Sequence, residues 1–98
     1  MSKAQRLREA TRAVWRRSYE NARVQSWWTQ AVPAVAALMA ELRQLPDEDA
    51  LQDHYWAPGD ISGETLRRHV TIEMQPEHLL ELEDACFWLR LRELCGDG

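Results

Sequence analysis

The spacing of apolar and polar positions predicts a chain that is mostly α-helical. From Lys3 to Val24 the sequence has no Gly or Pro and is rich in Ala, Arg, Glu and Gln, which favour helix. Small and apolar residues recur there every three or four positions, so that they gather on one face: Ala4, Leu7, Thr11, Val14, Trp15, Ser18 and Ala22. We therefore expect a long amphipathic N-terminal helix.

Pro33 interrupts the helical pattern that follows this segment. Proline has no backbone N–H and its ring clashes with the preceding turn, so we expect a kink or a helix restart at this point. Apolar residues keep helical spacing from Val35 to Leu45, and Pro46 then ends the helix.

Two short helices are expected in the middle of the chain. Asp47 can cap a helix from Glu48 to Trp56, whose acidic first turn suits the positive end of the helix dipole. Residues 57–60, Ala-Pro-Gly-Asp, predict a turn. Ser62 can cap a further short helix that ends at Arg68.

Residues 70–74 alternate between apolar and polar side chains, which is typical of a short strand. A single strand cannot satisfy its own backbone groups, so the segment either pairs with another copy or is an extended connection. Pro76 suits the first position of a final helix of ~30 Å, and Gly96 suits its end. The expected fold is all-α: one domain over residues 1–98, a bundle of four to five helices with a long kinked N-terminal helix, a long C-terminal helix and the open alternative of a strand at 70–74.

Composition and cysteine spacing bound the environment of the protein. The 98 residues suit one domain, and 45% apolar residues suffice for a core. No apolar run approaches the ~18 residues of a membrane span, and the N-terminus lacks the apolar block of a secretion signal. Cys86 and Cys95 lie ~13 Å apart along one helix, too far for a disulfide. These features predict a cytoplasmic protein with free thiols and no membrane association.

The net charge of −4 conceals an uneven distribution along the chain. Residues 1–43 contain eight Lys/Arg and three Asp/Glu, whereas residues 44–98 contain four and thirteen. One interpretation is a basic binding surface beside an acidic one. The other is that the two parts attract each other, within one chain or between neighbouring copies.

Arginine and aromatic residues of the first helix and the segment after it form the candidate binding surface. Four arginines line one side of the helix within ~80° of arc, where they can meet phosphates or carboxylates. The alternative is a solvated face paired with Glu9 and Glu20. Adjacent tryptophans on a helix point ~100° apart, so we expect one of the Trp27–Trp28 pair in the core and the other at an interface. The alternative for the tryptophans is that they build the core of the small bundle, namely Trp15, Trp28, Trp56 and Trp88. The candidate residues are Arg8, Arg12, Arg16, Arg23, Trp15, Tyr19, Trp27 and Trp28.

The final helix contains charges inside a wide apolar arc. Glu83 and Arg90 are ~10 Å apart along the axis, too far for easy pairing within one helix. An antiparallel second copy would pair each with the other, with a two-fold axis near Phe87. The alternative is two apolar stripes with exposed charges between them.

The sequence offers no arrangement suited to catalysis. Its histidines and cysteines lack zinc spacing, its serines lack a glycine-framed elbow, and no glycine-rich phosphate loop is present. We therefore expect no metal, no cofactor and no enzymatic activity. The favoured function is a protein-interaction module, such as an adaptor, an inhibitor or a small subunit of a larger complex, with the acidic segment 47–53 as a second surface for a basic partner. The alternative is a nucleic-acid-associated subunit that contacts backbone phosphates without reading sequence.

Overall fold

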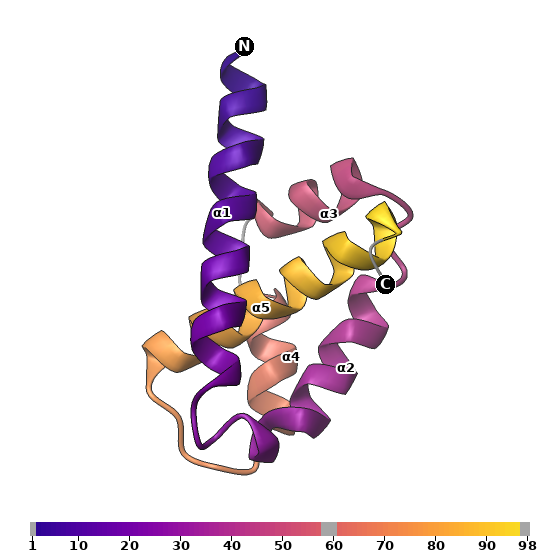
Figure 1. Ribbon diagram of the computed structural model, residues 1–98. Helices are drawn as coiled ribbons and strands as arrows, with labels where there is room; N and C mark the ends of the chain where they lie inside the picture. The colour runs from indigo at the N-terminus through magenta and orange to yellow at the C-terminus, as the bar shows by residue number, and fades with distance from the viewer. Residues whose placement is uncertain (1, 58–60, 97–98) are drawn as a thin grey trace.

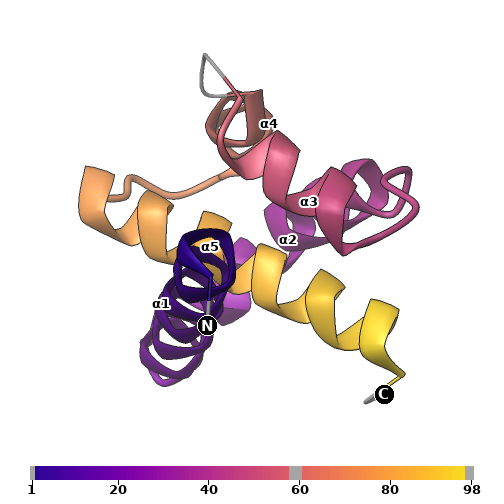
Figure 2. The same ribbon diagram turned by 90° about the horizontal axis from the view of Figure 1, so that it is seen from above.

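Five α-helices make up the part of the chain that the computed structural model describes, residues 2–57 and 61–96, with the backbone alone at 61 and 62 (Figure 1). They are α1 (Lys3–Arg23), α2 (Val32–Leu42), α3 (Glu48–Tyr55), α4 (Ile61–His69) and α5 (Pro76–Cys95), with a short 3-10 helix η1 (Thr29–Ala31) before α2. Helix α5 crosses the middle of the molecule and contacts the other four (Figure 1). Viewed down α1, α1 lies on one side of α5 and α4 on the other (Figure 2). The predicted all-α bundle is confirmed.

Helix α1 packs on α5 through its second half alone. Its start is capped by Ser2, whose Oγ accepts a hydrogen bond from the backbone N of Gln5 at 3.2 Å. Residues 2–10 are all exposed, and the first turns of α1 rise above the other helices (Figure 1). Its buried positions begin further along, at Thr11, Trp15, Ser18 and Ala22. This spacing places one narrow stripe of α1 against α5.

The N-terminal helix does not continue through Pro33. Helix α1 ends at Arg23, and the chain turns before α2 restarts at Val32. Pro33 then lies in the first turn of α2, where its missing N–H removes no helical hydrogen bond. Of the two expectations for Pro33, the structure shows a helix restart and not a kink. Two separate helices, α1 and α2, therefore stand where a long kinked N-terminal helix was expected.

The short helices follow the capping signals in part. Asp47 Oδ1 accepts a hydrogen bond from the backbone N of Ala50 at 2.9 Å, so the predicted cap of α3 is confirmed. Helix α4 already begins at Ile61, which places Ser62 inside the helix. The predicted cap at Ser62 is wrong, because an N-cap residue stands outside the helical backbone. The turn predicted at 57–60 lies, apart from Ala57, outside the described residues.

Residues 70–74 form an extended connection between α4 and α5. No strand is present in the described parts of the chain, so the strand alternative is wrong. Val70 and Met74 pack against the core, while Thr71 and Glu73 are exposed. The alternating pattern arises because every second side chain of this connection faces the bundle, and there is no neighbouring strand to pair with its backbone.

Trp15 occupies the centre of the core. Its side chain is 0% exposed, and its ring stacks on Phe87 with 5.2 Å between centroids and 18° between planes. Tyr55 meets the same ring edge-on at 5.3 Å. Buried side chains from every helix surround this cluster, among them Leu38, Leu42, Leu51, Leu66, Leu82 and Cys86. One aromatic stack thus joins α1, α3 and α5.

The two cysteines are free, as predicted. Cys86 is buried in the core, and burial raises the pKa of its thiol to about 12. Cys95 is exposed at the end of α5. Gly96 ends that helix in the left-handed conformation with φ 77°, which confirms the predicted stop.

Replacement of Trp15 by alanine should lower the free energy of unfolding by about 3–5 kcal/mol, because a fully buried aromatic side chain leaves a large cavity. Trp56 is 55% exposed, so Trp56→Ala is the matched control and should cost less than about 1 kcal/mol. Urea unfolding followed by circular dichroism measures both. Equal losses for the two variants would contradict the central role of Trp15.

Candidate functional site

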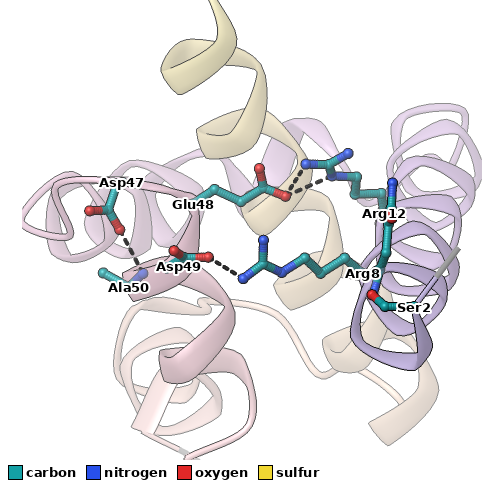
Figure 3. A network of polar contacts seen from close by, with 8 residues as sticks. Ser2, Arg8, Arg12, Asp47, Glu48, Asp49 and Ala50 are labelled. Atoms are coloured by element: carbon teal, nitrogen blue, oxygen red, sulfur yellow. Dashed lines mark hydrogen bonds and ion pairs between the residues drawn. The ribbon is translucent and has the colours of Figure 1, made fainter.

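Two arginines of the predicted basic row reach across a gap to α3. Arg8 Nη2 lies 2.5 Å from Asp49 Oδ1, and Arg12 Nε lies 2.7 Å from Glu48 Oε1 (Figure 3). Arg12 Nη2 donates a second hydrogen bond to the same Glu48 oxygen. The two guanidiniums therefore connect the N-terminal half of α1 to the first turn of α3.

These ion pairs connect the basic and the acidic parts of the sequence. The hydrogen bond from Arg12 to Glu48 is the main cause of the raised pKa of Arg12. Arg43 at the end of α2 makes a similar pair, with its Nη2 2.7 Å from Glu93 Oε2. This contact raises the pKa of Arg43 and lowers the pKa of Glu93. The placement supports the interpretation that the two parts attract each other within one chain.

The rest of the predicted row lies along the exposed side of α1. Arg16 Nε is 3.1 Å from Glu20 Oε1 in an exposed i,i+4 pair. The Arg23 guanidinium stands over the Tyr19 ring, 5.6 Å from its centroid. Trp15, which was predicted to border the row, is enclosed in the core and offers no surface to a partner.

Trp27 and Trp28 lie beyond the C-terminal end of α1, away from Arg8 and Arg12. Trp27 stacks on His78 at 5.2 Å between centroids, and Trp28 meets Tyr19 edge-on at 6.2 Å. Both tryptophans are half-buried and pack against the core. The structure therefore separates the predicted binding residues into two groups at opposite ends of α1.

The residues predicted for self-association are largely engaged within the chain. Phe87 is fully buried against Trp15, so a two-fold contact at its side chain would require the core to open. Arg90 Nη2 donates to the carbonyl oxygen of Leu45 at 2.8 Å, and its Nη1 lies 3.3 Å from Glu93 Oε1. Glu83 is half-buried on α5. The charge of Arg90 inside the apolar arc is thus accommodated without a second copy.

A recess between α1 and α3, which we call the α1–α3 notch, lies beside the ion pairs. It has a volume of about 390 Å³. Leu7 is 51% exposed and Trp56 is 55% exposed, so two large apolar side chains face solvent here. The notch is lined by Ala4, Leu7, Arg8, Asp49, Gln52, Asp53 and Trp56.

Gln52 gives the notch an unsatisfied polar group. The residue is 7% exposed, and its Nε2 has no hydrogen-bond partner among the described residues. A buried donor without an acceptor costs about 1–3 kcal/mol. This Nε2 is shielded from solvent, so a bound molecule that presents an oxygen would recover that cost only if the Gln52 side chain turned toward the notch.

Sequence reasoning did not identify the notch. The helical period assigned Leu7 to the core face of α1, and Trp56 was expected inside a small bundle. Gln52 carries no sequence signal, because its importance depends on burial between two helices. Leu7 lies in the first two turns of a 21-residue helix, and the sequence does not show where along that helix the packed stretch begins.

The described residues provide binding chemistry and no metal cluster. Within these residues no group of three or more His, Cys, Asp and Glu side chains could hold a metal ion. None of the described helices combines the length and apolarity required to cross a membrane. The notch instead combines apolar surface, one unpaired donor and charges at its edge, which suits the recognition of another molecule.

Comparison with known proteins identifies no relative. No protein-family model matches the sequence. No curated protein and no solved structure is significantly similar to it.

Asp84 is a half-buried carboxyl in the interface between α1 and α5. Ser18 Oγ donates a hydrogen bond to its Oδ2 at 3.2 Å. Burial raises the pKa of Asp84 to about 6, and the hydrogen bond from Ser18 offsets part of that rise. The nearby carboxylate of Glu81 raises it further. The main contact of α1 therefore contains a group that titrates just below neutral pH.

Asp84→Asn should stabilise the protein at pH 7.5 by about 1–2 kcal/mol, a figure reduced for partial exposure to solvent. The folded state holds the proton of Asp84 more tightly than the unfolded state, so the ionised wild-type residue costs stability above its folded pKa. The advantage of the variant should shrink as pH falls through about 6 and vanish near about pH 4. Urea unfolding across this range, with exposed Asp53→Asn as control, measures the difference. A pH-independent difference would exclude ionisation as its cause.

Double-mutant cycles should give a larger coupling energy for the Arg12–Glu48 ion pair, which joins α1 to α3, than for the Arg16–Glu20 ion pair within α1. For Arg12→Gln and Glu48→Gln we expect a coupling of about 1 kcal/mol, because the Glu48 side chain is only 24% exposed. For Arg16→Gln and Glu20→Gln we expect about 0.3–0.5 kcal/mol. The coupling comes from unfolding free energies of the single and double variants at low salt. Couplings of equal size would argue against a tie between α1 and α3.

Proposed function

We propose that this chain is a non-enzymatic protein-interaction module that binds a protein partner in the α1–α3 notch. The observation that carries the proposal is the presence of three incomplete features in one recess. Leu7 and Trp56 expose half of their apolar surface, and the buried Nε2 of Gln52 has no acceptor in the described chain. An adaptor, an inhibitor or a small subunit of a larger complex would use such a surface.

The projecting half of α1 gives further support. Residues 2–10 form more than two helical turns without a packed face. A helical segment of this length that packs against nothing is marginal in water, and here the ion pairs of Arg8 and Arg12 hold the segment to α3. A partner in the notch would cover Leu7, and each Å² of apolar surface that it buries would contribute about 25 cal/mol of favourable binding free energy.

The lining of the notch specifies the chemistry of the partner. An apolar side chain would fill the space between Leu7 and Trp56, and a carbonyl or carboxylate oxygen would accept from Gln52 Nε2 once the Gln52 side chain turned toward it. The Arg8–Asp49 pair at the edge would fix the orientation of the partner more than its affinity. Tryptophan and arginine are enriched among the residues that dominate binding energy.

The nucleic-acid alternative has less support. Arg8 and Arg12 each already have a carboxylate partner, so neither is free to neutralise a phosphate without losing an ion pair. Asp49 and Asp53 line the same recess and would repel phosphates.

The free thiols of Cys86 and Cys95 support a reducing compartment, and we place the protein in the cytoplasm on that ground.

Photo-crosslinking in the cell that makes the protein tests the proposal. A benzophenone amino acid in place of Leu7 should yield a discrete adduct with another protein, because residue 7 lines the notch. The same amino acid in place of Glu64, which is exposed on α4, is the control and should yield no such adduct. Mass spectrometry identifies the partner.

A second variant separates binding from folding. Gln52→Leu removes the unpaired donor, so it should raise the free energy of unfolding by about 1 kcal/mol while lowering the yield of the residue-7 adduct. Equal labelling from positions 7 and 64 would overturn the proposal. A nucleic-acid adduct at position 7 would favour the alternative function instead.

A further inference from the structure

A second apolar surface, separate from the notch, lies between α2 and the C-terminal half of α5. We call it the α2–α5 groove. It has a volume of about 450 Å³ and is open to solvent rather than enclosed. Leu89 of α5 forms part of one wall. The apolar wall of α2 consists of Val32, Val35, Ala36 and Met39.

Helix α2 is apolar on nearly every side. Glu41 is the one charged residue in its sequence, VPAVAALMAEL. Its inner face, with Leu38 and Leu42, is fully buried in the core. Its outer face leaves Val32 51% exposed and Ala36 exposed. A helix that is apolar all round is normally buried on all sides, so this face lacks a cover within the described chain.

The far end of the groove has an excess of positive charge. Glu93 Oε2 lies 2.7 Å from Arg43 Nη2, and Glu93 Oε1 lies 3.3 Å from Arg90 Nη1. Arg92 lines the same end. Two guanidiniums therefore share one carboxylate, in a part of the sequence that is otherwise acidic. A further carboxylate at this end would be attracted and could share the arginine donors.

We propose that the α2–α5 groove docks an amphipathic helix of a protein partner whose apolar stripe ends in an acidic residue. The stretch from Val32 to Arg43 is ~16 Å long, which matches three helical turns. The small side chain of Ala36 in the middle of the wall allows a second helix to approach to the usual 8–10 Å between axes. The apolar stripe would meet α2, and the carboxylate would lie at Arg43 beside Glu93.

Other occupants fit the groove less well. An open groove would leave one side of an acyl chain in water, whereas a helix covers both walls at once. The unpacked helical segment that a second copy could insert is the start of α1, and this segment is basic at Lys3, Arg6 and Arg8. Its charge would oppose the arginines at the end of the groove. The inference uses no residue of the notch and is independent of it.

A synthetic helical peptide tests the proposal. The probe is a fluorescein-labelled peptide of about 16 residues with leucines spaced i, i+3 and i+7 and a glutamate one turn beyond the last leucine. Fluorescence anisotropy with the full chain should show saturable binding. Replacing the peptide glutamate by lysine should weaken binding at least about tenfold, because the charge then repels Arg43.

Variants of the chain locate the site. Ala36→Trp fills the groove and should weaken binding of the glutamate peptide at least about tenfold. Ala10→Trp is the matched control on the exposed side of α1 and should bind as the wild type does. Circular dichroism checks that both variants fold, and the lysine peptide tests the charge on the unaltered chain.

Four results would overturn the proposal. The first is the absence of saturable binding, and the second is equal affinity for the glutamate and lysine peptides or for the wild type and Ala36→Trp. The third is a dimer of the chain alone, seen by sedimentation, that Ala36→Trp dissociates, which would make a second copy the occupant. The fourth is displacement of the peptide by dodecanoate at lower concentration than unlabelled peptide, which would make the groove an acyl-carboxylate site.

Discussion

The stack of Trp15 on Phe87 determines how the rest of the molecule is arranged. It is the point where α1 meets α5, and Tyr55 of α3 closes it from the edge. Because Trp15 lies in the middle of α1, packing there leaves the first half of that helix beyond the core. The projecting turns, the gap toward α3 and the two arginine bridges across it all follow from the position of this one residue.

Ion pairs hold the part of α1 that has no packed face. The turns before Thr11 bury no side chain, so Arg8 and Arg12 hold them through Asp49 and Glu48. The exposed Arg8–Asp49 pair contributes little free energy, whereas the more shielded Arg12–Glu48 pair contributes more. The uneven distribution of charge along the sequence therefore serves the fold, because it holds the start of α1 to α3.

Local signals in the sequence predicted where the helices begin and end. The contacts between helices depend on residues far apart in the chain, and the sequence alone did not predict them. The Asp47 cap and the Gly96 stop depend on neighbours within a few residues, and both were predicted. The pairing of Arg12 with Glu48 joins residues 36 apart, and the row of arginines alone could not specify it. Residues 70–74 show the same limit, because an alternating pattern describes which side chains face the bundle and not whether a neighbouring strand exists.

Both proposed binding surfaces are places where the sequence departs from what folding alone would favour. A small domain has about 5–15 kcal/mol of net stability, so an unpaired buried amide at Gln52 is a substantial cost. Polar residues on the outer face of α2 would cost nothing in the core, yet that face carries Val32, Val35 and Ala36. Departures of this kind are expected where a chain is shaped for recognition, because the missing contacts form when a partner arrives. The notch and the groove therefore lie where the chain lacks contacts that would stabilise its folded state.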